Sequence, residues 1–266
     1  PMTFQKPRAM TEEEIHEIID AFASAAVRAA EAGADAVQLH AAHGYLLSEF
    51  LSPFFNRRKD AWGGSPENRF RLLGEVFQAV RKRLPPDVPV LVKMNGNDFT
   101  PKPGMTPELA AFYAGRLADL GVDALEVSCG TFFTFHTMRG EVPAREISRA
   151  FPRWMRPLAK VLLGRQRKPC RLVEAYNLEA ARVIRPSLGG VPLILVGGLR
   201  SLPSVERILE RGDADLISLC RPLIREPLLI RRFQEGKAQQ PTCISCNRCF
   251  AAVATNRPVR CYRDGL

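Results

Sequence analysis

Helix-period segments alternate with short apolar runs along this chain. Three segments share one order, in which a helix ends at a glycine and an apolar run follows a turn with aspartate: EAGADAVQLH (31–40), LADLGVDALEVSCG (117–130) and LERGDADLISLCRP (209–222). Two further runs, VPVLVKMNG (88–96) and VPLILVGG (191–198), are each introduced by Val-Pro. Continuously apolar strands are typical of a parallel sheet buried on both faces. The pattern predicts strands at 35–40, 89–94, 124–128, 192–196 and 215–219.

Amphipathic segments separate these strands. Thr11 and Glu14 form a capping box, which predicts a helix start followed by one apolar face. Further helices are predicted at 65–84, from Thr106-Pro107 onward, and at 175–187, 201–211 and 223–235. Alternating strands and helices with short loops indicate an α/β fold. No strand is followed by GxGxxG or GxxxxGKS/T, so dinucleotide-binding and P-loop folds have no motif here.

Polar residues and glycines gather where the predicted strands end. They are His40, His43 and Tyr45, Lys93 and Asn95, Ser128 and Gly130, Gly197 and Gly198, and Cys220 and Arg221. A (β/α)8 barrel places its active site at this end of its strands. A barrel would therefore explain the positions of these polar residues. A barrel requires eight strands, however, and the sequence predicts five.

Two imidazoles and a phenol, His40, His43 and Tyr45, fall within six residues where the first strand gives way to a loop. One histidine in such a place is more often a core or capping residue. Two imidazole N–H groups three residues apart on a turn can instead converge on one oxygen and stabilise negative charge there. Lys93 ends the apolar run VLVK, where a charge is not buried without a partner. A lysine that reaches the surface along its stem is the alternative.

The composition is that of an ordinary globular protein. With 266 residues, 46% hydrophobic and 25% charged, the chain can bury a substantial core. The longest apolar runs are too short to span a bilayer, and the first residues lack the apolar core of a secretory signal. We therefore expect a cytoplasmic protein without a membrane partner.

The net charge of +10 is concentrated in one stretch. Only Glu146 opposes a series of cations between 145 and 171: Arg145, Arg149, Arg153, Arg156, Lys160, Arg165, Arg167, Lys168 and Arg171. Such a stretch can attract nucleic acid or the phosphates of a nucleotide-like ligand. A solvated basic face is the commoner explanation, and no aromatic-interleaved or helix-turn-helix pattern favours nucleic acid.

Four of the seven cysteines lie within the last 24 residues: Cys243, Cys246, Cys249 and Cys261. Without an export signal, they do not indicate a disulfide framework. Four thiolates spaced x2, x2 and x11 suit either a [4Fe–4S] cluster or a structural zinc, and the spacing does not separate the two. The remaining three, Cys129, Cys170 and Cys220, are expected to be buried thiols.

The segment HAAHGYLLSEFLSPFFNRRKDAWGGSPENRFR (40–71) resembles the signature of the old yellow enzyme family, the FMN-dependent NADH:flavin oxidoreductases. The resemblance continues through VLVKMNG, EVSCGT, LVGGLRS and DLISLCRPLIREP. The cysteine-rich tail is similar to the branch that contains 2,4-dienoyl-CoA reductase and trimethylamine dehydrogenase. Family members have three further βα units before the segment that opens this chain. The resemblance thus implies strands 4–8 of an FMN-binding TIM barrel in residues 1–236 and a metal-binding tail in 237–266.

The resemblance also implies residue roles. His40 and His43 would bind the substrate carbonyl oxygen, Tyr45 would donate a proton, and Lys93 would lie against the flavin pyrimidine. The flavin phosphate would be held by Gly197, Gly198, Cys220 and Arg221, where the family usually has glycine in place of Cys220. In the tail, the resemblance favours the [4Fe–4S] cluster over zinc. A polar loop network would also be formed, with Ser65 capping the next helix. Its expected members are Asn56, Arg57, Asp60, Gly63, Gly64, Ser65, Glu67, Asn68 and Arg69.

The implied activity is reduction of an enone or enoyl substrate, with NAD(P)H as electron donor. Because an open sheet exposes edge strands and apolar side chains, we expect a homo-oligomer or a partner chain that supplies further barrel strands. The alternative is a non-catalytic partial barrel, a subunit or remnant that needs a partner to complete the flavin site.

Overall fold

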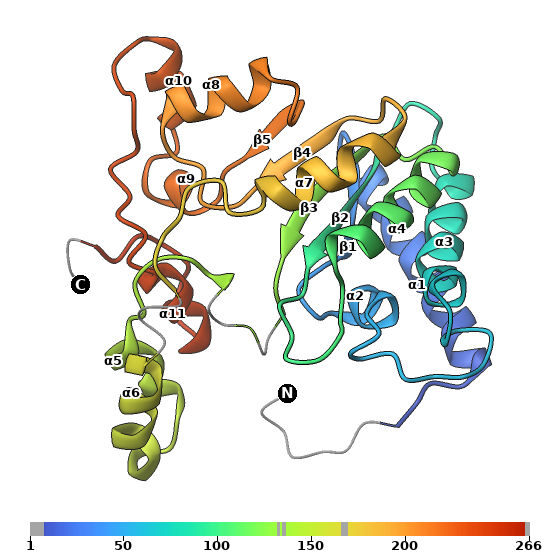
Figure 1. The fold of residues 1–266 in the computed structure, drawn as a ribbon, viewed down its shortest axis with the longest axis horizontal. Coiled ribbons are helices and arrows are strands. Elements are labelled where there is room, and N and C mark those ends of the chain that lie inside the picture. Colours follow the sequence, from blue (N-terminus) through green and yellow to red (C-terminus); the bar gives the residue numbers. More distant parts are fainter. Residues whose placement is uncertain (1–7, 132–133, 135–136, 166–169, 264–266) are drawn as a thin grey trace.

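The computed structural model describes residues 8–131, 134, 137–165 and 170–263. Within them, five strands form one parallel sheet in the order β1-β2-β3-β4-β5 (Figure 1). The strands are β1 Val37–Ala41, β2 Val90–Asn97, β3 Ala124–Cys129, β4 Leu193–Val196 and β5 Leu216–Ser218. All five strands predicted from the sequence are therefore present, and β2 continues beyond its predicted end to Asn97.

Helices connect successive strands, as the repeated pattern predicts. They are α1 Glu12–Glu31, α2 Leu46–Leu51, α3 Pro66–Arg83, α4 Pro107–Asp119, α7 Leu178–Ile184 and α8 Leu202–Glu210. The capping box of Thr11 and Glu14 is formed at the start of α1. Ser65 caps α3 by accepting a hydrogen bond of 3.2 Å from the Asn68 N–H.

Two predicted helices are interrupted at prolines. The segment predicted as 223–235 forms α9, Arg221–Arg225, and α10, Leu229–Gln234, on either side of Pro227. The segment predicted as 175–187 ends as the 3-10 helix η4, Arg185–Leu188, which contains Pro186. Proline lacks the N–H that an α-helix interior requires, so the helical periodicity continues in the sequence where the α-helix itself does not.

The two faces of the sheet differ. Side chains such as Leu39, Val92 and Leu125 are buried and pack with α1, α3 and α4, which lie together beside the sheet in Figure 1. The alternate positions form the opposite face, where His40 is exposed and Leu216 at the β5 edge is 51% exposed. Because successive residues of a strand point to opposite faces, the polar residues of the predicted site lie on the face away from these helices.

Aspartates of the repeated turn join neighbouring strands at their amino ends. Asp123 N–H donates to Val90 O at 3.2 Å, and Asp123 Oδ2 accepts from Val90 N–H at 2.7 Å. Asp215 forms the same pair with Leu193, at 2.9 and 2.7 Å. Asp35 holds the corresponding place before β1, is exposed, and accepts no hydrogen bond from the described residues. The repeated aspartate thus caps the first N–H of the preceding strand wherever that strand is present.

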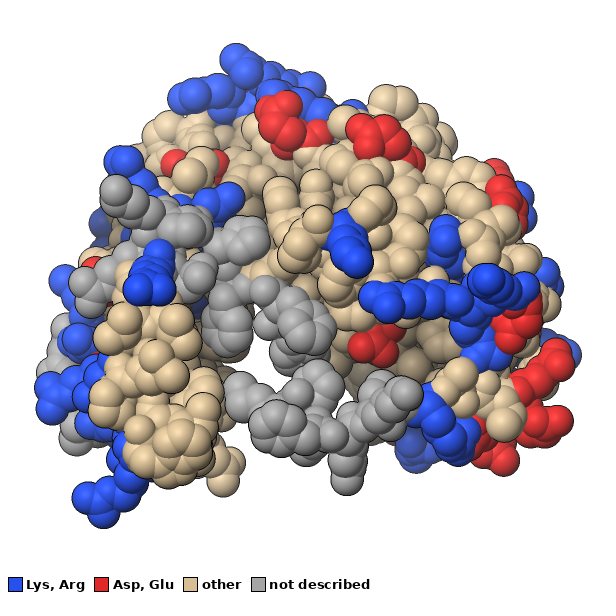
Figure 2. Space-filling view, turned by 60° about the horizontal axis from the view of Figure 1, so that its bottom comes forward, with Lys and Arg blue, Asp and Glu red and all other residues tan. Residues whose placement is uncertain are grey.

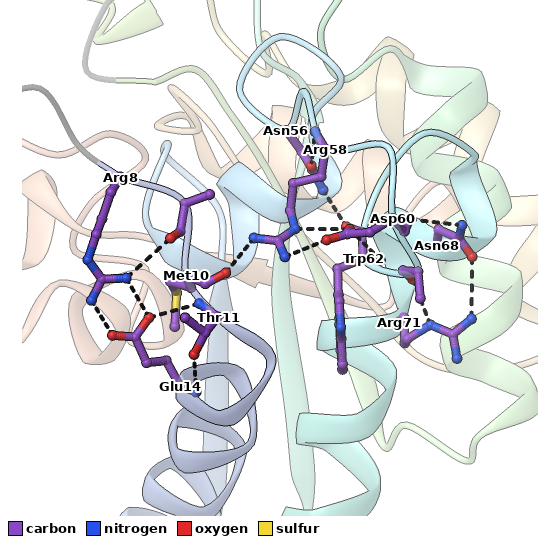
Figure 3. Close-up of polar contacts among 12 residues, drawn as sticks. Arg8, Met10, Thr11, Glu14, Asn56, Arg58, Asp60, Trp62, Asn68 and Arg71 are labelled. Atoms are coloured by element: carbon purple, nitrogen blue, oxygen red, sulfur yellow. Dashed lines mark hydrogen bonds and ion pairs between the residues drawn. The ribbon is translucent and has the colours of Figure 1, made fainter.

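The loop between α2 and α3 is organised by Arg58, shown with its neighbours in Figure 3. Its guanidinium donates to both carboxylate oxygens of Asp60, at 3.0 and 2.6 Å, and to Met10 O at 2.8 Å. Asn56 donates to Phe50 O and Trp62 O, both at 2.8 Å. Of the residues expected in a polar network, Asn56, Asp60 and Asn68 form hydrogen bonds here, and these are centred on Arg58, a residue that the sequence did not single out.

The basic stretch forms an excursion away from the sheet, visible at the lower left of Figure 1. It contains α5 (Ala144–Ile147), two 3-10 turns, η2 (Ser148–Ala150) and η3 (Arg153–Met155), and α6 (Arg156–Arg165). Lys and Arg side chains gather on the corresponding left-hand part of Figure 2. Arg167 and Lys168 lie outside the described residues. A last helix, α11 (Arg248–Ala254), lies in the tail, and no helix of the described chain is long and apolar enough to cross a membrane.

The aspartate pairing predicts unequal effects of equivalent substitutions. Asp123→Ala and Asp215→Ala should each lower the free energy of unfolding by about 1 kcal/mol, because each leaves a strand N–H without its acceptor. Asp35→Ala is the matched control and should cause no measurable loss. Urea denaturation of the three variants checks this, and an equal loss in Asp35→Ala would contradict the proposed role of the repeat.

Candidate active site at the carboxyl end of the sheet

Three aromatic rings meet where β1 ends. The ring centroids of His40 and His43 are 5.1 Å apart, with their planes at 67°. The centroids of His40 and Tyr45 are 5.0 Å apart. Tyr45 is 48% exposed and occupies the N-cap position of α2. The structure therefore brings together the three residues that the sequence assigned to one cluster, with the phenol on the accessible side.

The backbone at His43 is held in an unusual conformation. His43 has φ 64°, and Gly44 follows with φ 76°. A left-handed conformation at a non-glycine residue costs free energy and persists where surrounding contacts enforce it. Here the His43 N–H donates to Asn95 Oδ1 at 3.2 Å, and His43 forms a bridge with Thr131. Contacts from β2 and from the loop after β3 thus fix the turn that carries the imidazole.

Asn95 is the centre of a buried network. Its Nδ2 donates to Asp98 Oδ1 at 2.8 Å and to Gly130 O at 2.7 Å, and the side chain is fully buried. Asp98 Oδ2 accepts from Ser52 Oγ at 2.6 Å, and Asp98 is also fully buried. This network ties the loops after β1 and β3 to β2, so the site has a rigid base.

The two histidines are neutral near pH 7. Burial is the main reason that the pKa of His43 falls to about 4, and the nearby Lys93 charge lowers it further. Burial and then Lys93 also lower the pKa of His40. A neutral imidazole carries one N–H donor and one acceptor nitrogen. His43 Nε2 is 2.7 Å from Ser128 Oγ, so one of its two ring nitrogens is already engaged by β3.

Lys93 is partnered within the sheet. In the register of the strands, His40, Lys93 and Glu126 lie side by side on β1, β2 and β3. Lys93 Nζ is 3.0 Å from Glu126 Oε1, and Gln38 Nε2 donates to Glu126 Oε2 at 3.0 Å. Glu126 is 5% exposed, so its charge is stabilised by these two contacts. Lys93 thus has the partner that a charge at the end of an apolar strand requires.

The glycines after β4 are required by close packing. Gly197 and Gly198 have φ of 136° and 70°. A Cβ on Gly197 would lie 2.8 Å from Asn177 Nδ2, and one on Gly198 would lie 2.6 Å from Val173 O. Tyr176 also contacts both positions. The loop after β4 therefore lies directly against the segment before α7.

Arg221 faces the loop after β3 and the tail. Its Nη1 donates to Arg139 O at 2.6 Å and to Asn247 Oδ1. Burial raises the pKa of the Tyr176 phenol to about 12, while the charge of Arg221 acts in the opposite direction. Tyr176 is thus near both Arg221 and the glycine pair, which places the predicted phosphate-binding residues in one region. Cys220 is exposed, so the expectation that it is a buried thiol is wrong.

The four tail cysteines line one pocket together with Arg221 and Arg225. Arg225 Nη1 donates to Cys261 Sγ at 3.3 Å. Burial raises the pKa of Cys249, Arg221 lowers it, and Cys243 and Cys246 raise it. No three His, Cys, Asp or Glu side chains of the described residues are arranged to hold a metal ion. The donor set therefore surrounds one space, while the sulfur atoms do not adopt ligating positions.

Comparison with known proteins identifies the family. The profile of the NADH:flavin oxidoreductase / NADH oxidase family matches residues 2–150, more than half of the chain. The chain belongs to this family. It is 39% identical over 233 residues to the NADH-dependent flavin oxidoreductase iccE of Talaromyces variabilis, covering 86% of this chain and 50% of that protein. The chain thus spans about half the length of the curated relatives it matches.

Two solved structures show the same fold. A 2-naphthoyl-CoA reductase in complex with 2-naphthoyl-CoA has a TM-score of 0.78 and 26% identity, covering 96% of this chain and 34% of that chain. The old yellow enzyme homologue from Zymomonas mobilis has a TM-score of 0.64 and 26% identity, covering 90% and 57%. The resemblance to the old yellow enzyme family is confirmed. The five-stranded sheet is the part of the TIM-barrel fold that the sequence predicted.

The lowered pKa of His43 predicts a pH dependence of stability. The unfolded chain binds a proton near pH 6.5 and the folded chain only near pH 4, so stability rises with pH in this window and is lost on acidification. The contribution reaches up to about 3 kcal/mol. In His43→Gln, the free energy of unfolding should fall less between pH 6.5 and 4 than in the wild type. Parallel pH profiles from urea denaturation would contradict the assignment.

Proposed function

We propose that this protein is an FMN-dependent NAD(P)H oxidoreductase that reduces activated alkenes. The observation that supports the proposal most is the convergence of His40, His43 and Tyr45 beside Lys93 at the carboxyl end of the sheet. Family membership supports the flavin and the nicotinamide donor. The substrate class, an enone or enoyl compound, is inferred from what the three side chains can do together.

The histidines would bind the substrate carbonyl oxygen. When a hydride adds to the β-carbon of an activated alkene, negative charge builds on that oxygen, and donors already in place stabilise it most. The low pKa values of His40 and His43 keep both rings neutral, so each offers an N–H without carrying a buried charge. Tyr45, whose ring lies against His40, would then deliver a proton to the α-carbon.

The chain also has groups that suit FMN, which when bound would supply the hydride. Lys93 would stabilise negative charge on the flavin pyrimidine. Gly197, Gly198, Cys220 and Arg221 would hold the phosphate through backbone N–H groups and the guanidinium. Support comes from the positive φ angles of Gly197 and Gly198 after β4 and from Arg221, which begins α9 shortly after β5. Residues 1–236 would form this flavin-binding unit.

For the tail, residues 237–266, we infer a [4Fe–4S] cluster held by Cys243, Cys246, Cys249 and Cys261, with zinc as the alternative. The support is the pocket that all four cysteines line. Four cysteine thiolates are the ligand set of both groups. The free state of all seven cysteines also supports a reducing, cytoplasmic location.

The second candidate function is a non-catalytic partial barrel that needs a partner chain or a second copy to complete the flavin site. The observation that favours it is the exposed Asp35, whose counterparts Asp123 and Asp215 each cap a neighbouring strand. A parallel strand beside β1 would supply the missing N–H. Strands from a partner or from elsewhere in a longer chain would therefore complete the site in either candidate.

The oxidoreductase proposal predicts a split effect of Tyr45→Phe. In the FMN-loaded protein, reduction by NADH or NADPH should proceed at the wild-type rate, because that half-reaction needs no proton at the α-carbon. Reoxidation by 2-cyclohexenone should slow by at least about tenfold, since general acid catalysis contributes a factor of 10² or more. Stopped-flow absorbance measures both steps. A variant slowed in reduction and unchanged in reoxidation would contradict the role of Tyr45.

The cluster proposal predicts the metal content of the tail. Anaerobic preparations should be brown and contain iron and acid-labile sulfide in a ratio of about four each per chain. Cys246→Ser should abolish both, whereas Cys170→Ser, which changes a buried cysteine outside the pocket, should retain them. Metal analysis and visible absorbance decide the question. Stoichiometric zinc in a colourless protein would replace the cluster with a structural zinc site.

A further inference from the structure

Ser128 is the only described side chain that hydrogen-bonds the His43 ring. The distance from Ser128 Oγ to His43 Nε2 is 2.7 Å, and Ser128 is 7% exposed. The residue lies on β3, while the His43 main chain is held from β2 by Asn95. Two strands therefore hold His43: a β2 residue binds its backbone N–H, and a β3 residue binds one nitrogen of its ring.

The direction of the Ser128 hydrogen bond determines what the other nitrogen can do. A hydroxyl can donate or accept, and a neutral imidazole has a single proton. If Ser128 accepts, the proton is on Nε2, and Nδ1 presents a lone pair that would repel an anionic oxygen. If Ser128 donates to Nε2, the proton is on Nδ1, which is then a hydrogen-bond donor. No described residue hydrogen-bonds Nδ1.

We propose that Ser128 is a positioning residue whose hydroxyl donates to His43 Nε2 and so keeps the imidazole proton on Nδ1, ready for a substrate oxygen. The choice of Ser128 as the donor rests on the proposed function, because that function requires an N–H at Nδ1, whereas the contact itself does not. Burial and then the Lys93 charge lower the pKa of His43 and so disfavour a second proton on the ring. In a neutral ring, the tautomer decides whether His43 can donate a hydrogen bond from Nδ1.

The tautomer can be measured directly in the chain itself. Two-bond proton–nitrogen correlation spectra of protein labelled with nitrogen-15 histidine at neutral pH distinguish Nδ1–H from Nε2–H. The chain has four histidines, so His43→Gln identifies the signal. We expect Nδ1–H in the wild type, a shift toward Nε2–H in Ser128→Ala, and recovery of Nδ1–H in Ser128→Thr. Nε2–H in the wild type, or an unchanged tautomer in Ser128→Ala, would overturn the proposal.

Ser52→Ala is the matched control. It removes another buried hydroxyl, which donates to Asp98 in the network below the site, and it leaves the His43 ring contact in place. A general loosening of the site would alter the tautomer in both variants, whereas the proposal requires a change in Ser128→Ala alone. Equal tautomer shifts in the two variants would therefore contradict a specific role of Ser128.

Ligand binding separates this inference from the proposed function. In the FMN-loaded protein, 4-nitrophenolate serves as the anionic-oxygen probe, and its affinity should fall about tenfold or more in Ser128→Ala, since a hydrogen bond to a charged group is lost. Ser52→Ala should stay within about twofold. If the tautomer behaves as expected but His43→Gln binds the probe as tightly as the wild type, the proposed role of His43 fails while the role of Ser128 in the tautomer stands.

Discussion

Parallel strand pairing is the constraint on which the candidate site depends. In a parallel sheet, residues of equal register lie side by side and all carboxyl ends meet at one edge. Here the register sets His40 beside Lys93 and Lys93 beside Glu126, although these residues are 53 and 33 positions apart in the chain. A shift of one residue in β2 would turn Lys93 into the helix-packed core and Val92 onto the polar face. The charge, the histidines and their partners would then no longer meet.

The same register holds the charged side chains of Lys93 and Glu126 close to the neutral histidines. Glu126 is almost fully buried and is stabilised by the Lys93 ammonium and the Gln38 amide. The pair keeps Lys93 in one place on the face of the sheet. From there, its charge disfavours protonation of both His40 and His43. The ion pair therefore fixes the position of the cation, while burial is the main reason that the neighbouring histidines are neutral; Lys93 adds to this effect and Glu126 opposes it.

The sequence predicted the strands well because their signal is local. Apolar runs of four to eight residues between turn residues are sufficient to locate β1 to β5, and the capping of α1 and α3 follows from residues three positions apart. Two predicted helices are interrupted in the structure, because Pro186 and Pro227 break the α-helix although the apolar periodicity continues in the sequence. The cluster of His40, His43 and Tyr45 could also be recognised, since its members are neighbours in the chain.

The hydrogen bonds of the cluster could not be predicted in this way, although the sequence placed Asn95 and Ser128 at the same ends of the strands. Asn95, Ser128 and Glu126 act on residues 33 to 88 positions away, through hydrogen bonds that exist only once the strands are in register. A signal was nevertheless present. Polar residues in an otherwise apolar, buried strand are costly without partners, and Glu126 and Ser128 both interrupt the run ALEVSC. For the contacts of Arg221 with Arg139 and Asn247, the sequence contains no such signal. Both partners lie in irregular segments, whose paths no periodicity determines.

The open face of the sheet connects the site to the rest of the protein's architecture. Parallel sheets are ordinarily covered on both faces, yet His40 and Leu216 are exposed on the face away from α1, α3 and α4. Asp35 adds a directional argument, since an aspartate at this position in the other two units caps the strand that precedes it in the sheet. A strand placed there would run parallel to β1 and bring its own carboxyl end beside His40. In the proposal of further strands, completing the sheet would therefore also complete the polar site, by the same rule of parallel pairing that assembles the five strands.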